Sequence, residues 1–99
     1  MIAITPIEID QTASSGVWSF NTPKFSGADL RQIIIVPTSE STTYNLTITD
    51  EYDNVVLDRP SLTGTLNELL YLPLRGVYTV AVDTASADEN FTGRLLVEE

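Results

Sequence analysis

The sequence of 99 residues contains neither cysteine nor histidine, and each absence excludes whole classes of function. Without cysteine the chain can form no disulfide and no thiolate metal site. Without histidine it lacks the commonest general base and the commonest zinc ligand, and a Ser-His-Asp triad is impossible. Catalysis would have to rest on carboxylates or on the single lysine, Lys24. We therefore expect a protein that is not an enzyme and that uses no cofactor.

Basic residues are scarce, with five Lys and Arg against 14 Asp and Glu, so the net charge is −9. A protein that binds nucleic acid needs Lys and Arg to neutralise phosphates, and here the cations are scattered along the chain. The same charge disfavours binding to anionic membrane surfaces. No apolar run approaches the roughly 20 residues of a membrane-spanning helix. We expect neither nucleic acid nor a membrane as a partner.

Apolar residues alternate with polar ones along most of the chain, which is the pattern of half-buried β-strands. The clearest example is Tyr44, Leu46 and Ile48, which alternate with Asn and Thr. The pattern predicts strands at 2–9, 18–20, 32–36, 44–49, 55–57, 65–74, 79–82 and 91–97. Segment 65–74 also fits a short helix, but a strand is favoured. Seven or eight short strands separated by turns predict one all-β domain over residues 1–99, an antiparallel β-sandwich of immunoglobulin-like or jelly-roll-like type. Residues 1–11 are expected to be an edge strand or an N-terminal arm.

Two runs of four apolar residues, 33–36 and 69–72, break the alternation. Each strand of a two-layer sandwich buries one face, so such a run places two apolar side chains on the outer face. Either another part of the chain covers them, or a neighbouring subunit does, since exposed apolar patches mark interfaces. The candidate interface residues are Ile33, Ile35, Leu70 and Leu72, or their alternates, because the sequence does not determine which set faces outward.

Acidic residues gather in two loops. Asp50 and Asp53 are weak candidates for calcium ligands, but the EF-hand pattern is absent. The alternative is a hairpin turn at Asp53-Asn54, since both residues tolerate left-handed backbone, and this is the favoured interpretation. The second loop is acidic at positions 83, 88 and 89 and would form a carboxylate pair with the first only if both lay at one end of the sandwich. Tyr52, at the hairpin tip, is the aromatic ring expected to be exposed.

Three segments resemble small virion proteins of tailed bacteriophages. Segment 44–57, YNLTITDEYDNVVL, resembles a hairpin that reads roughly Y-x-hydrophobic-T-hydrophobic-T-D-E-x-G-x-D-hydrophobic-L in those proteins. Segment 72–80, LPLRGVYTV, is similar to their L-P-x-x-G-x-hydrophobic-T-hydrophobic segment, and 92–97, TGRLLV, is similar to their closing strand. The hairpin Gly of the pattern is absent here, where Asp53-Asn54 forms the tip.

The resemblance implies a non-enzymatic structural protein of the virion, in first place a capsid decoration or cement protein. Its partners would be the major capsid protein or other virion subunits, and it would form a homo-oligomer. It would be found in the virion, assembled in the host cytoplasm, and would act by burying apolar strand faces and edge strands against its neighbours. A tail or baseplate component fits the same segments. A carbohydrate- or calcium-binding β-sandwich module is the alternative from another class.

Overall fold

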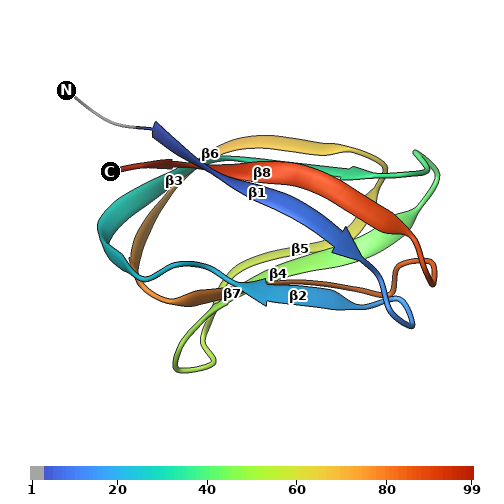
Figure 1. The fold of residues 1–99 in the computed structure, drawn as a ribbon, viewed down its shortest axis with the longest axis horizontal. Coiled ribbons are helices and arrows are strands. Elements are labelled where there is room, and N and C mark those ends of the chain that lie inside the picture. The colour runs from blue at the N-terminus through green and yellow to red at the C-terminus, as the bar shows by residue number, and fades with distance from the viewer. Residues whose placement is uncertain (1–3) are drawn as a thin grey trace.

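The computed structural model describes residues 4–99, which form eight β-strands arranged in two layers (Figure 1). The strands are β1 (Ile4–Thr12), β2 (Trp18–Asn21), β3 (Phe25–Pro37), β4 (Thr43–Asp50), β5 (Val55–Thr63), β6 (Leu66–Gly76), β7 (Tyr78–Asp83) and β8 (Asn90–Glu98). The first sheet has the order β1-β8-β3-β6 and the second β2-β7-β4-β5, and every pairing is antiparallel. The predicted antiparallel β-sandwich is confirmed. No helix long and apolar enough to cross a membrane occurs within residues 4–99.

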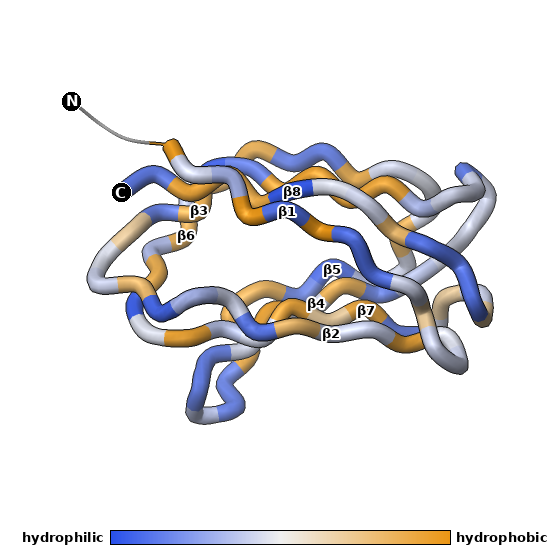
Figure 2. The backbone as a smooth tube through the Cα atoms, in the orientation of Figure 1, coloured by the Kyte–Doolittle hydropathy of each residue, from blue (hydrophilic) through white to orange (hydrophobic). Residues whose placement is uncertain are grey.

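The alternation of the central strands directs one row of side chains into the space between the sheets. On β4, Tyr44, Leu46 and Ile48 are buried, while the Asn and Thr residues between them face outward. β7 repeats this with Val80 and Val82. Figure 2 shows the resulting distribution, with hydrophobic segments along both layers and a hydrophilic β4–β5 hairpin that projects from them. The core therefore lies between the two sheets, as the period of two requires.

Aromatic rings fill the centre of this core. Tyr44 and Phe91 meet edge to face with their centroids 5.3 Å apart, and Trp18 packs against Phe91 at 5.7 Å. The Tyr44 hydroxyl donates a hydrogen bond of 2.7 Å to the carbonyl oxygen of Gly64, in the turn between β5 and β6. Burial raises the pKa of Tyr44 to about 12. The side chain thus ties the β5–β6 turn to the interior of the second sheet.

Replacing Tyr44 by phenylalanine is expected to lower the free energy of unfolding by about 1–2 kcal/mol, because the buried Gly64 carbonyl loses its donor. Urea denaturation measures this as a lower midpoint with an unchanged slope. Tyr52→Phe removes the same hydroxyl at an exposed position and is expected to leave the midpoint unchanged. Equal midpoints for the two variants would contradict the role assigned to the Tyr44 hydroxyl.

A bidentate ion pair closes one open side of the sandwich, where the edge strand of each sheet comes close to the other. Arg59 of β5 donates to Glu68 of β6 through Nε at 2.8 Å and through a terminal nitrogen at 2.6 Å. Glu68 occupies an inward position, since it is paired with the buried Ile33. Hydrogen bonding to Arg59 lowers the pKa of Glu68. The charges of Arg59 and Glu68 therefore compensate each other, so β5 and β6 can each carry a charged side chain on the inner face.

Residues 4–12 form β1, which pairs with β8 and lies at the edge of the first sheet. Met1, Ile2 and Ala3, the start of the segment expected to be an edge strand or an arm, lie outside the described residues. The start of β1 and the end of β8 lie at one end of the sandwich, together with the β2–β3, β4–β5 and β6–β7 connections (Figure 1). The other four connections lie at the opposite end.

Candidate functional site

The two outer faces of the sandwich differ in character. The second sheet presents Asn45, Thr47 and Thr49 from β4, in register with Asp83, Ala81 and Thr79 of β7. These side chains are short and mostly polar, so this face is suited to contact with water. Because the outer face of the first sheet is more apolar, it is the candidate site.

The first sheet exposes large apolar side chains on its outer face. Leu69 and Tyr71 of β6 are 78% and 64% exposed, and Ile4 of β1 is 61% exposed. Between these two edge strands the register aligns Pro6, Leu96, Gln32 and Leu69 in one row across all four strands. We call Ile4, Pro6, Leu69, Tyr71 and Leu96 the apolar face. A hollow of about 300 Å³ lies on this face, and the residues that line it are Ile4, Arg31, Gln32, Leu69, Leu70, Leu96 and Glu98.

A β-bulge in β3 shapes the middle of this surface. Leu30 and Ile33 are both buried, while Arg31 and Gln32 between them face outward, and the register of β3 shifts here against both neighbours. An extra residue of this kind bends the strand and redirects side chains. The bulge therefore brings Arg31 onto the outer face of the first sheet.

Arg31 holds a position over the Tyr71 ring, with its guanidinium carbon 5.4 Å from the ring centroid. It also pairs with Glu98 at 3.2 Å. The neighbouring Asp29 accepts from the Tyr71 hydroxyl and raises its pKa, and its negative charge adds to this effect. Since exposed ion pairs contribute little to stability, their effect here is to orient the Tyr71 ring on the surface.

Of the four interface residues named from the sequence, Leu70 lines the hollow on this surface, and the other three do not. Ile33 and Ile35 are 0% exposed and belong to the core, and Leu70 and Leu72 are half-buried and pack against it. Because side chains alternate along a strand, the outward positions are the alternates, Leu69 and Tyr71 on β6 and the half-buried Ile34 and Val36 on β3. Each run therefore has two outward apolar residues, and the set named from the sequence faces inward. That either set forms an interface stays a prediction.

Three of the four edge strands of the two sheets contain a proline, and a proline closely follows the fourth. The edge strands β1, β5 and β6 contain Pro6, Pro60 and Pro73, and Pro23 follows the fourth, β2, by two residues. Proline has no amide hydrogen to donate to an added strand, and edge prolines protect sheets from edge-to-edge pairing. This disfavours the expected contribution of edge strands to association and leaves the sheet faces as contact surfaces.

Asp50 and Asp53, the weak calcium candidates, serve the hairpin turn. Asp50 Oδ1 accepts backbone hydrogen bonds from Tyr52 and Asn54, both at 2.9 Å, and Oδ2 accepts from the Asn54 amide at 3.1 Å. These bonds hold the pKa of Asp50 below its usual value, with the Asn54 backbone the largest cause. Asp53 takes the left-handed position with φ 65°. Nowhere in residues 4–99 do three or more acidic side chains gather in a way that could hold a metal ion.

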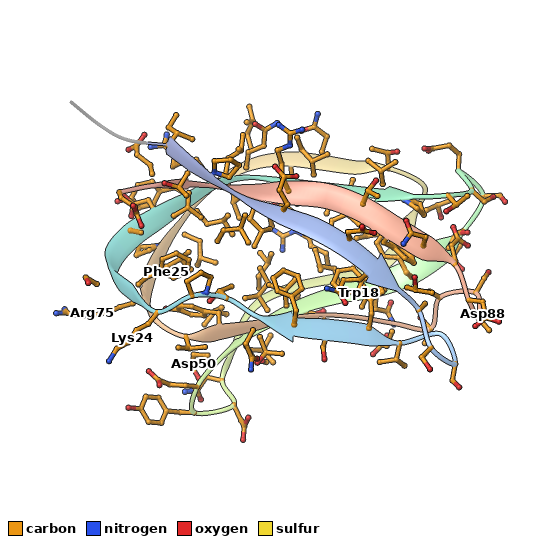
Figure 3. All side chains as sticks on the ribbon, viewed as in Figure 1. Trp18, Lys24, Phe25, Asp50, Arg75 and Asp88 are labelled. Carbon is orange, nitrogen blue, oxygen red and sulfur yellow. The ribbon has the colours of Figure 1, made fainter. Side chains whose placement is uncertain are left out.

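The two acidic loops lie at opposite ends of the molecule, as the positions of Asp50 and Asp88 in Figure 3 show. A carboxylate pair formed between them is therefore impossible. Glu89 of the second loop accepts from the Thr42 hydroxyl at 2.5 Å and from the Ser39 amide at 3.0 Å. Its carboxylate joins the β7–β8 loop to the β3–β4 loop, which is a structural role.

Comparison with known proteins finds no matching family model and no matching protein of curated function. Among solved structures, the infectious bursal disease virus VP2 subviral particle shares 13% identity and a TM-score of 0.47, over 98% of this chain and 33% of that chain. A family two carbohydrate esterase from Cellvibrio japonicus shares 10% identity and a TM-score of 0.40, over 98% and 33%. The chain thus spans about a third of the length of these structures. Such identities and TM-scores support no conclusion about its function.

Proposed function

We propose that the chain is a non-enzymatic structural protein of a virion, a capsid decoration or cement protein that packs its apolar face against a neighbouring virion subunit. The observation that carries the proposal is that Ile4, Leu69 and Tyr71 are exposed together on the outer face of the first sheet. The neighbour is the major capsid protein or another virion subunit, and further copies of this chain are part of the same assembly.

The energetics fit a contact that many copies share. Burying apolar surface contributes about 25 cal/mol per Å², so a face of a few large side chains gives a modest contact. When many such contacts form on one particle, the modest contribution of each is multiplied. The charge of −9 favours solubility of the free subunit, although its apolar face remains open to water.

The virion part of the proposal rests on the three segments that resemble phage virion proteins. They correspond to the β4–β5 hairpin, the β6–β7 turn and the body of β8. The missing hairpin glycine is compensated, because Asp53 adopts the left-handed conformation at the tip. The departure from the pattern therefore leaves the shape of the hairpin intact.

Changing Leu69 and Tyr71 together to serine is expected to weaken binding to particles by at least about tenfold, since two exposed anchors are lost from the contact. Particles are purified on a density gradient from two cultures. One produces particles with the gene for this protein present, and the other produces them with the gene deleted. Mass spectrometry then measures the copy number, and sedimentation measures binding of purified variants to particles that lack the protein. Immunogold labelling distinguishes a position on the head from one on the tail or baseplate.

The matched control is Val17→Ser with Val55→Ser, which removes two other exposed apolar side chains that lie outside the apolar face. This double variant is expected to bind as the natural chain does. Absence of the protein from purified particles would overturn the virion role. Equal binding by both double variants would overturn the assignment of the contact to the apolar face.

A further inference from the structure

Three connections meet around a hollow at the end of the sandwich where β1 begins and β8 ends. The β2–β3 linker, the tip of the β4–β5 hairpin and the β6–β7 turn enclose a volume of about 480 Å³. The residues that matter here are Lys24, Ser26, Glu51, Tyr52, Arg75 and Gly76. They come from separate parts of the sequence, and no part of the apolar face lines the hollow.

Two cations stand side by side in this hollow. Phe25 is paired with Gly76, and Lys24 and Arg75 immediately precede the two residues of that pair in the sequence. Figure 3 shows both side chains directed outward at this end. The ion pairs within residues 4–99 are Arg31–Glu98 and Arg59–Glu68, so neither cation of the hollow is neutralised by one. In a protein of charge −9, such a pair is placed to receive an anionic group.

The same hollow also holds an aromatic ring and a hydrogen-bond acceptor. Tyr52 is 79% exposed at the hairpin tip, where it supports no part of the core. The Glu51 carboxylate lies over Gly76, where any larger side chain would collide with it. Ser26 lies within reach as a neutral donor and acceptor. A few polar groups around an exposed aromatic ring are the elements of a specific ligand site.

We propose that this hollow binds an acidic saccharide. The carboxylate of the sugar lies between Lys24 and Arg75, its ring packs on Tyr52, and Glu51 accepts from a sugar hydroxyl. A simple anion such as phosphate would leave the Tyr52 ring without a partner, and a neutral sugar would leave both cations unmatched. Arginine offers a planar pair of donors that fits a carboxylate. The inference is independent of the contact proposed for the apolar face.

The test uses trigalacturonate, an oligomer of three sugar acids, titrated into the full chain while amide chemical shifts are followed by NMR. We expect shifts at the hairpin tip and around Arg75. Lys24→Gln with Arg75→Gln is expected to weaken binding by at least about tenfold, since two charge-assisted bonds are lost. Tyr52→Ala is expected to weaken it by about fivefold, the usual contribution of a ring contact. Arg94→Gln removes a positive charge elsewhere and is expected to bind as the natural chain does.

Two further titrations separate this proposal from simpler ones. Maltotriose, which carries no charge, is expected to cause no shifts in the hollow, and inorganic phosphate is expected to bind more weakly than trigalacturonate. Phosphate binding as tight as that of the saccharide, with no effect of Tyr52→Ala, would overturn the proposal in favour of a plain anion site. An absence of shifts at millimolar trigalacturonate would overturn it outright. Unchanged melting temperatures of the variants show that each remains folded.

Discussion

Gly93→Ala is expected to destabilise the protein by about 4 kcal/mol, a large part of the stability of a domain of this size. Gly93 lies on β8 between two strands, paired with Ile9 of β1 and Ile35 of β3. A Cβ at this position would collide with the backbone carbonyl of Ile34, which cannot move without breaking the sheet. The residue also has φ +148°, a conformation that side chains disfavour.

Gly27→Ala separates these two effects. Gly27 has nearly the same backbone angle, φ +153°, but no atom lies within 4 Å of the position its Cβ would take. Its substitution is expected to cost only about 1–2 kcal/mol of conformational strain. Urea denaturation measures the free energy of unfolding of both variants. If Gly93→Ala is already unfolded in its far-ultraviolet circular dichroism spectrum, this agrees with the prediction. Similar losses in both variants would show that the clash does not decide the effect.

Ile33→Ala is expected to lower the free energy of unfolding by about 3 kcal/mol, because it leaves a cavity in the core between the sheets. The adjacent Ile34→Ala makes the same chemical change on the outer face of β3, where the remaining space opens to water, and is expected to cost less than about 1 kcal/mol. Thermal and urea unfolding of both variants measure the difference. Equal losses, or a larger loss for Ile34, would contradict the orientation of β3.

The strands and the layered arrangement could be predicted because local chemistry determines them. The alternation at Tyr44, Leu46 and Ile48 needs no knowledge of distant residues, and Asp53-Asn54 marks a turn by itself. The exposure of Tyr52 follows from that turn. Strand lengths were underestimated where polar outward residues hide the pattern. β3 begins at Phe25 and β5 continues to Thr63 through Pro60, which is tolerated because β5 is an edge strand.

The orientation of the apolar runs could not be read from the sequence. Every residue in 33–36 is apolar, so either alternate set can face the core, and the bulge at Arg31 shifts the pattern that precedes the run. On β6, the inward Glu68 makes the choice harder, since a charge normally marks the outer face. Its position opposite Ile33 in the sheet directs it inward, and Arg59 of the other sheet compensates its charge there.

The hollow around Lys24 and Arg75 was missed, although the sequence contains a signal for it. When successive antiparallel strands run up and down, every second connection lies at the same end of the sandwich. The connections after the second, fourth and sixth strands therefore meet, which brings Lys24, Tyr52 and Arg75 together. The acidic loops follow the fourth and seventh strands and must lie apart. With either seven or eight strands possible, the sequence alone did not determine which connections share an end of the sandwich.

The prolines at the four open borders bear on how the protein behaves when it is abundant. A β protein at high concentration is at risk of joining into fibres, because each unpaired backbone border can template another chain. Here the borders are interrupted by Pro6, Pro60 and Pro73, and by Pro23 just beyond the fourth. These interruptions are expected to slow the growth of such fibres from the sheet borders.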